Sequence, residues 1–338
     1  MDLVQPLLNG ERRALARMLT ALENERPGYE TALAALYPHT GRAWIVGITG
    51  APGTGKSSLV SALAKAYRAR GQTVAILAVD PTSPFTGGAI LGDRIRMRDL
   101  AGDAGVFIRS MATRGSLGGL ARATRDAIRV MDAAGFDRVL VETVGAGQSE
   151  IDIVRAAYTT IVIEAPGLGD DVQAIKAGIL EIADVLAVNK ADLSGADNTV
   201  RGLRAMLELG HPASRTELLQ HHGQLMSVEP SANGHNAPLW MPPIVRTVAT
   251  NGQGVDELLD AIEQHREHVL SAGLVELERA HIEIEIYERL RETLLLRFLQ
   301  ALPGDTLADM LRRVQAREID PRGAVSELMG LVGNQAIG

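Results

Sequence analysis

Residues 50–57 read Gly-Ala-Pro-Gly-Thr-Gly-Lys-Ser, and this stretch decides how the rest of the chain folds. It fits the pattern G-x-x-x-x-G-K-[ST] at every fixed position, which is typical of a loop that binds phosphate groups. Its glycines let the backbone turn tightly, so that successive N–H groups face phosphate oxygens. Lys56 is long enough to reach the β- and γ-phosphates, and Ser57 offers a hydroxyl ligand for Mg²⁺. The residues expected to contact a nucleotide are Gly50, Ala51, Pro52, Gly53, Thr54, Gly55, Lys56, Ser57 and Ser58.

The sequence on both sides of this loop fits the same interpretation. An apolar run at 44–48 precedes it and is typical of a strand, and apolar residues follow it at helical spacing as far as Tyr67. A strand, a glycine loop and a helix place a bound anion at the N-terminus of the helix. A glycine-rich turn that matches by chance would not have both flanks. We therefore predict an α/β fold of the P-loop NTPase type, with a mostly parallel central sheet flanked by helices.

The composition limits the classes of protein to consider. The chain has 338 residues with a formal net charge of −7, so it lacks the basic character typical of nucleic-acid binding. It contains no cysteine, which excludes disulfides and thiolate metal sites and suits a reducing compartment. No apolar run of about 18 residues and no signal-peptide pattern is present. We expect a soluble cytoplasmic protein that binds neither nucleic acid nor membrane.

The chain divides into three predicted regions. Residues 1–42 contain apolar residues at helical spacing and are predicted to form an N-terminal helical extension. Residues 43–253 carry the phosphate loop and the apolar strands and are predicted to form the nucleotide-binding domain. Residues 254–338 are almost wholly helical in pattern, with apolar side chains on more than one face. Such a surface needs to be buried, either on the main domain or against another subunit.

Carboxylates follow the predicted strand at 73–79. Asp80 ends this strand, and Asp93 lies in the proline- and glycine-rich loop that comes next. Ligands of open α/β sheets bind at the carboxyl ends of the strands, so both are candidate Mg²⁺ or water-orienting residues. Asp93 fits a helix N-cap as well. The strand also follows the phosphate-loop helix directly, as in the signal-recognition-particle and MinD branch of nucleotide hydrolases rather than the Ras branch.

A second acidic motif ends the apolar strand at 137–144. Glu142 stands where the acidic metal motif usually has Asp, and Gly145 follows three residues later. We expect Glu142 to reach Mg²⁺ through a water molecule and the Gly145 N–H to sense the γ-phosphate. The alternative for Glu142 is an ordinary surface acid at the end of a strand.

The base-recognition motif N-K-x-D follows the apolar strand at 182–188, as Asn189, Lys190 and Asp192. A carboxylate here accepts hydrogen bonds from guanine N1–H and the exocyclic amine, whereas adenine has no such donors on that edge. Discrimination of about 10⁴ is expected when a buried polar group is left unsatisfied. Ala249, which follows the predicted strand at 244–248, lies in the last loop expected to contact the base.

Three longer blocks give the chain a family resemblance. They are VDPTSPFTGGAILGDRIRM from Val79, ETVGAGQSE from Glu142 and GDDVQAIKAGILEIADVLAVNKAD from Gly169. Together they resemble the MeaB/ArgK family, which are GTPase chaperones of adenosylcobalamin-dependent methylmalonyl-CoA mutase and related acyl-CoA mutases. The resemblance covers about residues 8–205 closely and the C-terminal helices loosely. The segment 211–243 departs from it, being longer and more polar than expected.

The resemblance implies a function and site residues. It implies GTP and GDP as ligands with Mg²⁺, held by Ser57, Asp80, Asp93 and Glu142, and catalysis carried by Lys56, Asp93, Glu142 and Lys176. It implies that a mobile loop at 170–181, with Asp170, Gln173 and Lys176, responds to binding of the mutase. It further implies slow GTP hydrolysis that the mutase stimulates, gated delivery of the cofactor, protection or reactivation of the mutase, and an adenosyltransferase as a further partner. A homodimer held by the C-terminal helical arm is implied too.

Two other functions use similar loops. A P-loop small-molecule kinase shares the phosphate loop, but the N-K-x-D motif argues against it. A nickel-insertion GTPase would be expected to carry Cys and His metal sites, and the chain has no cysteine. The histidines between 211 and 235 match no ligand spacing and are interpreted as loop residues.

Overall fold

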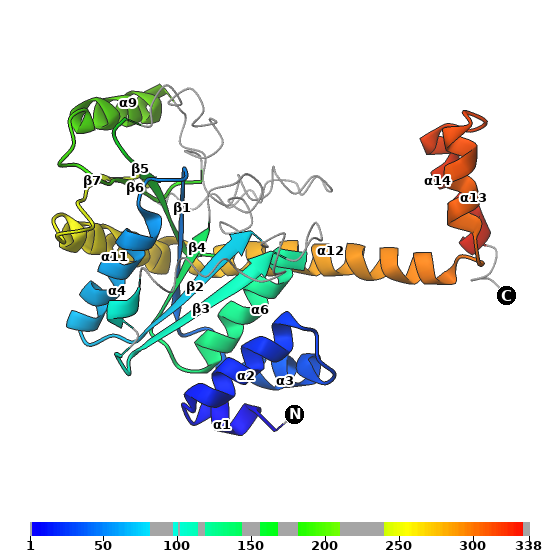
Figure 1. The fold of residues 1–338 in the computed structure, drawn as a ribbon, viewed down its shortest axis with the longest axis horizontal. Coiled ribbons are helices and arrows are strands. Elements are labelled where there is room, and N and C mark those ends of the chain that lie inside the picture. The colour runs from blue at the N-terminus through cyan, green and yellow to red at the C-terminus, as the bar shows by residue number, and fades with distance from the viewer. Residues whose placement is uncertain are drawn as a thin grey trace. The chain divides into compact units, whose positions relative to one another are not determined.

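A computed structural model describes residues 2–81, 97–100, 102–113, 119–143, 156–167, 182–209 and 240–333 of the chain. The chain forms two compact units, Met1–Ala280 and His281–Gly338. The first unit contains the phosphate loop and a twisted sheet with helices on both faces (Figure 1). The second unit is helical.

The sheet of the first unit is parallel in every described strand pair. Its order is β3-β2-β4-β1-β5-β6-β7. The strands are β1 (Trp44–Gly50), β2 (Val74–Pro81), β3 (Val106–Thr113), β4 (Arg138–Thr143), β5 (Thr159–Glu164), β6 (Val185–Val188) and β7 (Ile244–Arg246). This confirms the predicted P-loop NTPase-like sheet. All described strands therefore end at one edge, where ligands of such sheets bind.

Strand β4 lies between β1 and β2, and this position brings two motifs together. Although β2 follows β1 in the chain, β1 pairs with β4, with Ile48 beside Glu142. The strand that ends in the phosphate loop and the strand that carries the acidic motif are therefore neighbours. Both strands are buried along their whole length, which fits their near-continuous apolar sequences.

Helices cover the two faces of the sheet. On one face α2 (Arg12–Glu23), α3 (Tyr29–Leu36) and α6 (Gly119–Ala133) share an apolar core with the strands, together with α1 (Val4–Leu8). On the other face lie α4 (Lys56–Ala69) and α11 (Val255–Ala272) (Figure 1). Helix α9 (Ala196–Leu209) packs on β6 and β7. Short 3₁₀ turns occupy Tyr37–His39 and Arg98–Leu100.

A buried arginine joins the two helices of the second face. Arg138 at the start of β4 pairs with Glu263 of α11 at 2.9 Å, and its guanidinium lies 5.3 Å from the ring centre of Tyr67 in α4. The pKa of Tyr67 is raised because burial disfavours its phenolate form. A second ion pair, Arg70 with Asp260 at 2.7 Å, links the same helices. Helix α11 is thus fixed to the phosphate-loop helix.

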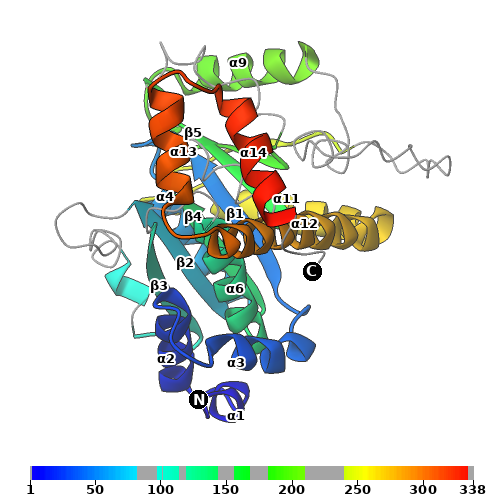
Figure 2. The ribbon, with the colours of Figure 1, turned by 90° about the vertical axis from the view of Figure 1, so that its right-hand side faces the viewer.

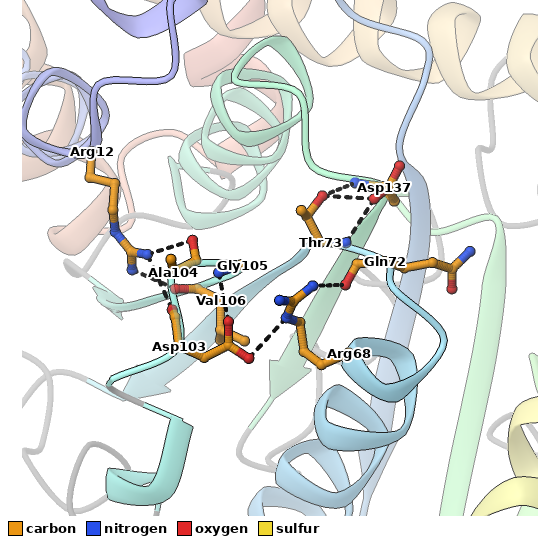
Figure 3. A network of polar contacts seen from close by, with 9 residues as sticks. All are labelled: Arg12, Arg68, Gln72, Thr73, Asp103, Ala104, Gly105, Val106 and Asp137. Atoms are coloured by element: carbon orange, nitrogen blue, oxygen red, sulfur yellow. Dashed lines mark hydrogen bonds and ion pairs between the residues drawn. The ribbon is translucent and has the colours of Figure 1, made fainter.

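A polar network closes the edge of the sheet where β2, β3 and β4 begin (Figure 3). Asp103 accepts hydrogen bonds from Arg68 at 2.9 Å and from the Gly105 N–H at 2.7 Å. Arg12 of α2 donates to the main-chain oxygens of Asp103, Ala104 and Val106. Asp137 bonds to the main chain and the hydroxyl of Thr73. The network attaches the N-terminal helices and α4 to the edge of the sheet where these strands begin.

The second unit consists of the later part of α12 (Leu274–Ala301) with α13 (Thr306–Gln315) and α14 (Pro321–Gly333). Helices α13 and α14 form a hairpin (Figure 2) around Met310, Ala324 and Leu328. The carboxylate of Asp320 accepts hydrogen bonds from the main-chain N–H groups of Arg322 and Gly323, as expected for an N-cap. None of the described helices combines the length and the apolar character needed to cross a membrane.

The contacts divide the chain after Ala280, which is later than the start of the predicted C-terminal region at 254. The reason is that α11 packs on α4 and on strands β5, β6 and β7. Its apolar residues Leu258, Leu259 and Ile262 are fully buried there. The predicted division into three regions, and the role of 254–338 in dimerisation, stay predictions.

Candidate nucleotide-binding site

The phosphate loop joins the end of β1 to the start of α4, and two of its glycines lie where a side chain has no room. Gly50 has φ +144°, and a β-carbon there would stand 2.2 Å from the main-chain oxygen of Ile163 in β5. Gly55 has φ +92°, and a β-carbon would stand 2.5 Å from Nδ2 of Asn189. The loop therefore packs tightly against two neighbouring segments, which only glycine permits at these points.

Lys56 opens helix α4 and turns back over its own loop. Its side chain is buried, with Nζ 2.8 Å from the oxygen of Gly50 and 3.1 Å from that of Ala51. The ammonium group therefore lies over the loop whose N–H groups are expected to hold phosphates. A phosphate bound there lies at the N-terminus of α4, where the helix dipole favours negative charge.

Ser57 and Glu142 meet at the same edge. Oγ of Ser57 lies 2.6 Å from Oε1 of Glu142, and both residues are buried. The pair comes together because β4 is the neighbour of β1. A hydroxyl and a carboxylate are oxygen ligands of the kind that Mg²⁺ prefers, so these side chains fit the predicted metal. Their role as ligands stays a prediction.

Several predicted site residues lie wholly or partly outside the residues that the structure describes. Asp80 lies within β2, at the edge where the strands end, but the structure does not describe its side chain. The others lie outside the described residues: Asp93, Gly145, Asp170, Gln173, Lys176 and the histidines between 211 and 235. Within the described ranges, no group of three or more His, Asp or Glu side chains is arranged to hold a metal ion.

Asn189 connects the phosphate loop to the loop that follows β7. Its Nδ2 donates to the oxygen of Thr54 at 2.8 Å. Its Oδ1 accepts from the main-chain N–H of Ala249 at 3.1 Å and from Oγ1 of Thr247 at 3.2 Å. Lys190 adds a bond from Nζ to the oxygen of Gly53 at 2.7 Å. The two loops expected to hold phosphate and base are thus joined by the side chains of one motif.

The side chain of Asp192 is exposed, whereas that of Asn189, at the start of the same motif, is buried. Asp192 makes no hydrogen bond or ion pair with any residue that the structure describes. A carboxylate in this position is available to a ligand, as the base-recognition hypothesis requires. Lys190, two residues earlier, has φ +55°, an uncommon backbone conformation for a residue with a side chain.

Thr247, which is fully buried and contacts Asn189, is not predicted from the sequence. Only its place at the end of a short apolar strand signals such a role, and threonine is common at strand ends. The hydroxyl of Thr143 donates to that of Thr49 at 3.3 Å and links the ends of β4 and β1, and this bond is not predicted from the sequence either. Both contacts join residues far apart in the sequence.

A Thr–His–Asp arrangement lies in the first unit, but its geometry is that of a structural contact. Nδ1 of His265 lies 2.9 Å from Oγ1 of Thr159, and Nε2 lies 3.4 Å from Oδ1 of Asp184. All three residues are buried, and Trp44 donates to the same Thr159 oxygen at 2.9 Å. A substrate has no access to the hydroxyl. The cluster fixes α11 to the beginnings of β5 and β6.

Comparison with known proteins gives a consistent result. The model of a family described as "Methylmalonyl Co-A mutase-associated GTPase MeaB" matches residues 15–302. A putative GTPase of Pyrococcus abyssi is 46% identical over 329 residues, covering 97% of this chain and 95% of the relative. The GTPase ArgK of Escherichia coli is 34% identical over 286 residues, covering 83% and 80%. A crystal structure of a LAO/AO transport system kinase matches with a TM-score of 0.67 at 25% identity, covering 98% and 97%.

Proposed function

Because the chain belongs to the MeaB family of methylmalonyl-CoA mutase-associated GTPases, we propose that it binds and hydrolyses GTP to regulate a B12-dependent acyl-CoA mutase. The observation that carries the proposal is the Asn189 side chain, which joins the phosphate loop to the loop after β7. Because Asn189 bonds to both loops, the regions expected to bind the phosphates and the base form a single site. The cytoplasm is the proposed compartment, since a chain without cysteine suits reducing conditions.

The phosphates of GTP are held by the loop 50–58 and by the first turn of α4. Lys56 exchanges its bonds to the oxygens of Gly50 and Ala51 for bonds to the β- and γ-phosphates. Ser57 and Glu142, with Asp80 and Asp93, are the proposed side chains around Mg²⁺, which neutralises phosphate charge when bound. The Gly145 N–H is proposed to contact the γ-phosphate.

The base is read by Asp192, whose exposed carboxylate accepts from guanine N1–H and the exocyclic amine. The hydrogen bond between Asn189 and the main-chain N–H of Ala249 holds the loop after β7 close to this contact. Adenine presents no donor at N1, so its binding leaves the carboxylate without a partner. Since a bound base covers this exposed carboxylate, adenine would bury it unpaired, and we expect a large selectivity for guanine.

Hydrolysis by the protein alone is proposed to be slow. Ras-type enzymes carry a glutamine directly after the glycine of the acidic motif, and here that position is Ala146. The site thus lacks one donor for the charge that develops in the transition state. The expected kcat is on the order of 10⁻³ to 10⁻² s⁻¹, as for unassisted GTPases. Binding of the mutase is proposed to supply the missing contact through the loop that contains Lys176.

Single-turnover hydrolysis of GTP, with and without the adenosylcobalamin-dependent mutase, tests this coupling. We expect the mutase to raise the rate about tenfold or more, which requires about 1.4 kcal/mol of transition-state stabilisation. Lys176→Ala should bind GTP normally but lose the stimulation. An unchanged wild-type rate would rule out the coupling. Equal stimulation of wild type and Lys176→Ala would rule out only the assignment of Lys176. Transfer of cobalamin from a loaded adenosyltransferase to the mutase, measured with and without this protein and GTP, tests cofactor delivery.

Homodimer formation through the second unit is proposed from its exposed apolar residues. Between His281 and Gly333 the exposed side chains include Ile286, Leu290, Leu294, Leu311 and Met329. A surface of this kind needs a partner to cover it. Sedimentation of full-length Leu294→Glu should show a monomer. Gln300→Glu adds the same charge at another exposed position of α12 and should stay dimeric. Dimers of both variants would place the interface elsewhere.

A small-molecule kinase is the second candidate, and the name of the structural match, a transport system kinase, favours it. A kinase would transfer the γ-phosphate to an acceptor instead of to water. Phosphate release from GTP in the absence of any acceptor distinguishes the two. Release at the slow rate given above supports the GTPase, whereas release that depends on an added acceptor supports the kinase.

A further inference from the structure

We infer that Gly254 is a positioning residue for base recognition, because it holds the guanine loop, residues 248–251, against Asn189. The inference rests on the proposed binding of guanine nucleotides and extends it to a residue that touches no ligand. Gly252 and Gln253 separate this loop from Gly254, which is the residue before the first turn of α11. Its role follows from how closely the main chain of β7 passes it.

A side chain has no room at Gly254. The residue has φ +74°, and a β-carbon built on it would stand 1.8 Å from the oxygen and 2.9 Å from the carbonyl carbon of Arg246. The Cα atom of Thr247 would be 3.2 Å away. These are main-chain atoms, so no rotation of a side chain relieves the collision. Gly252 has a similar φ of +82° but nothing within 4 Å of its β-carbon position.

Hydrogen bonds close the guanine loop on itself just before Gly254. The N–H of Val248 donates to the oxygen of Gln253 at 2.9 Å, and the N–H of Gly252 donates to the oxygen of Val248 at 3.0 Å. Gln253 is the residue next to Gly254, and Val248 is the residue next to Thr247. The close approach of Gly254 to β7 therefore sets the path of the loop at both of its ends.

Helix α11 cannot move to make room. Leu258, Leu259 and Ile262 on its inner side are fully buried. Asp260 and Glu263 are paired with Arg70 and Arg138 at 2.7 and 2.9 Å. In contrast, β7 has three residues, is half-buried to exposed, and lies at the edge of the sheet next to β6. A side chain at position 254 would therefore displace β7 and the guanine loop.

This displacement affects two of the contacts of Asn189. Thr247 and Ala249 donate to its Oδ1 and move with β7 and the loop. The bond from Asn189 to Thr54 and the phosphate loop itself are on the other side and remain. Binding of the base should thus weaken while binding of phosphate is retained. A general loss of folding would weaken both.

Calorimetry on full-length variants, with GDP, ADP and inorganic pyrophosphate as ligands in Mg²⁺, tests the inference. Gly254→Ala should lose about tenfold or more of the preference for GDP over ADP and keep its affinity for pyrophosphate within about threefold. Gly252→Ala is the matched control, because it bears the same cost of a left-handed backbone in open space. It should keep the preference of the wild type.

Each other outcome has a defined meaning. A wild-type preference in Gly254→Ala would overturn the inference and leave the proposed function intact. An equal loss of GDP and pyrophosphate binding would also overturn it, since the role would then be structural. Equal binding of GDP and ADP by the wild type would instead contradict the proposed function. If Gly254→Ala does not fold, Thr247→Val removes one contact of Asn189 without backbone strain. It should lower the preference about threefold or more, and an unchanged preference would overturn the inference.

Discussion

The two edges of the central sheet use polar side chains in different ways. Where the strands begin, carboxylates are satisfied by the protein: Asp132 accepts from the N–H groups of Gly41, Arg42 and Ala43. Asp103 and Asp137 are bonded in the network of Figure 3. Where the strands end, Lys56 donates to the carbonyl oxygens of Gly50 and Ala51 in its own loop, and the carboxylate of Asp192 is exposed.

We expect this difference to separate residues that stabilise the unit from residues that bind its ligand. Carboxylates at the first edge tie distant segments together, so their loss should lower the free energy of unfolding and leave the site chemistry unchanged. Side chains at the second edge have contacts that a nucleotide can replace. Their loss should affect ligand binding more than folding. Substitutions at the two edges test this contrast.

Lys56→Ala should have the largest effect of these substitutions. It should lower the rate of GTP hydrolysis and leave the free energy of unfolding nearly unchanged. It removes the charge expected to stabilise the transferring phosphate, so GTP hydrolysis should fall by about 10² to 10³-fold. The unfolding free energy should change by about 1 kcal/mol or less, because the loop carbonyls that it leaves can bond to water. Phosphate-release kinetics and urea titration measure the two effects. Activity close to that of the wild type would remove Lys56 from the site.

Asp132→Ala should show the opposite behaviour. Its carboxylate accepts three main-chain hydrogen bonds within the segment that leads into β1, and it is buried. Its removal should cost about 2–4 kcal/mol of unfolding free energy, measured by urea titration. The GTPase rate per folded molecule should stay unchanged. Asp99→Ala, which removes an exposed ion pair with Lys65, is the control and should cost under about 1 kcal/mol. Equal losses in both variants would contradict the account.

Asp103→Asn should have the smallest effect, and one that depends on pH. The bond from Arg68 and the Gly105 N–H lower the pKa of Asp103 from its ordinary value of 3.8. A carboxyl whose pKa is lower in the folded state stabilises the fold above its unfolded pKa. This contribution is lost as the pH falls through the folded pKa. The difference in urea midpoint between wild type and variant should therefore be present at neutral pH and shrink below about pH 4. A difference that does not depend on pH would contradict the assignment.

Local patterns in the sequence predicted much of this first unit. The phosphate loop, the apolar strands and the Asn189 motif each consist of neighbouring residues whose spacing reflects one physical requirement. The helices at the N-terminus followed from their apolar spacing in the same way, and α2 is found at Arg12–Glu23.

Such local patterns do not predict contacts between segments that are distant in the sequence. The sequence does not show that β4 separates β1 from β2, although this order brings Ser57 to Glu142. Nor does it show that Arg12 reaches the loop before β3, or that Gly254 passes the main chain of Arg246. These features depend on the packing of whole elements. A glycine in a turn and a threonine at a strand end are too common to signal them.

Calorimetric titration of the wild-type protein with GDP and ADP in Mg²⁺ tests the central claim, that the edge where the strands end binds guanine nucleotides. We expect GDP to bind at least about a hundredfold tighter than ADP, since Asp192 finds donors only on guanine. Asp192→Asn should reverse the preference toward xanthosine diphosphate, because the amide presents a donor to the additional carbonyl of that base. Equal affinities of the wild type for GDP and ADP would contradict the claim.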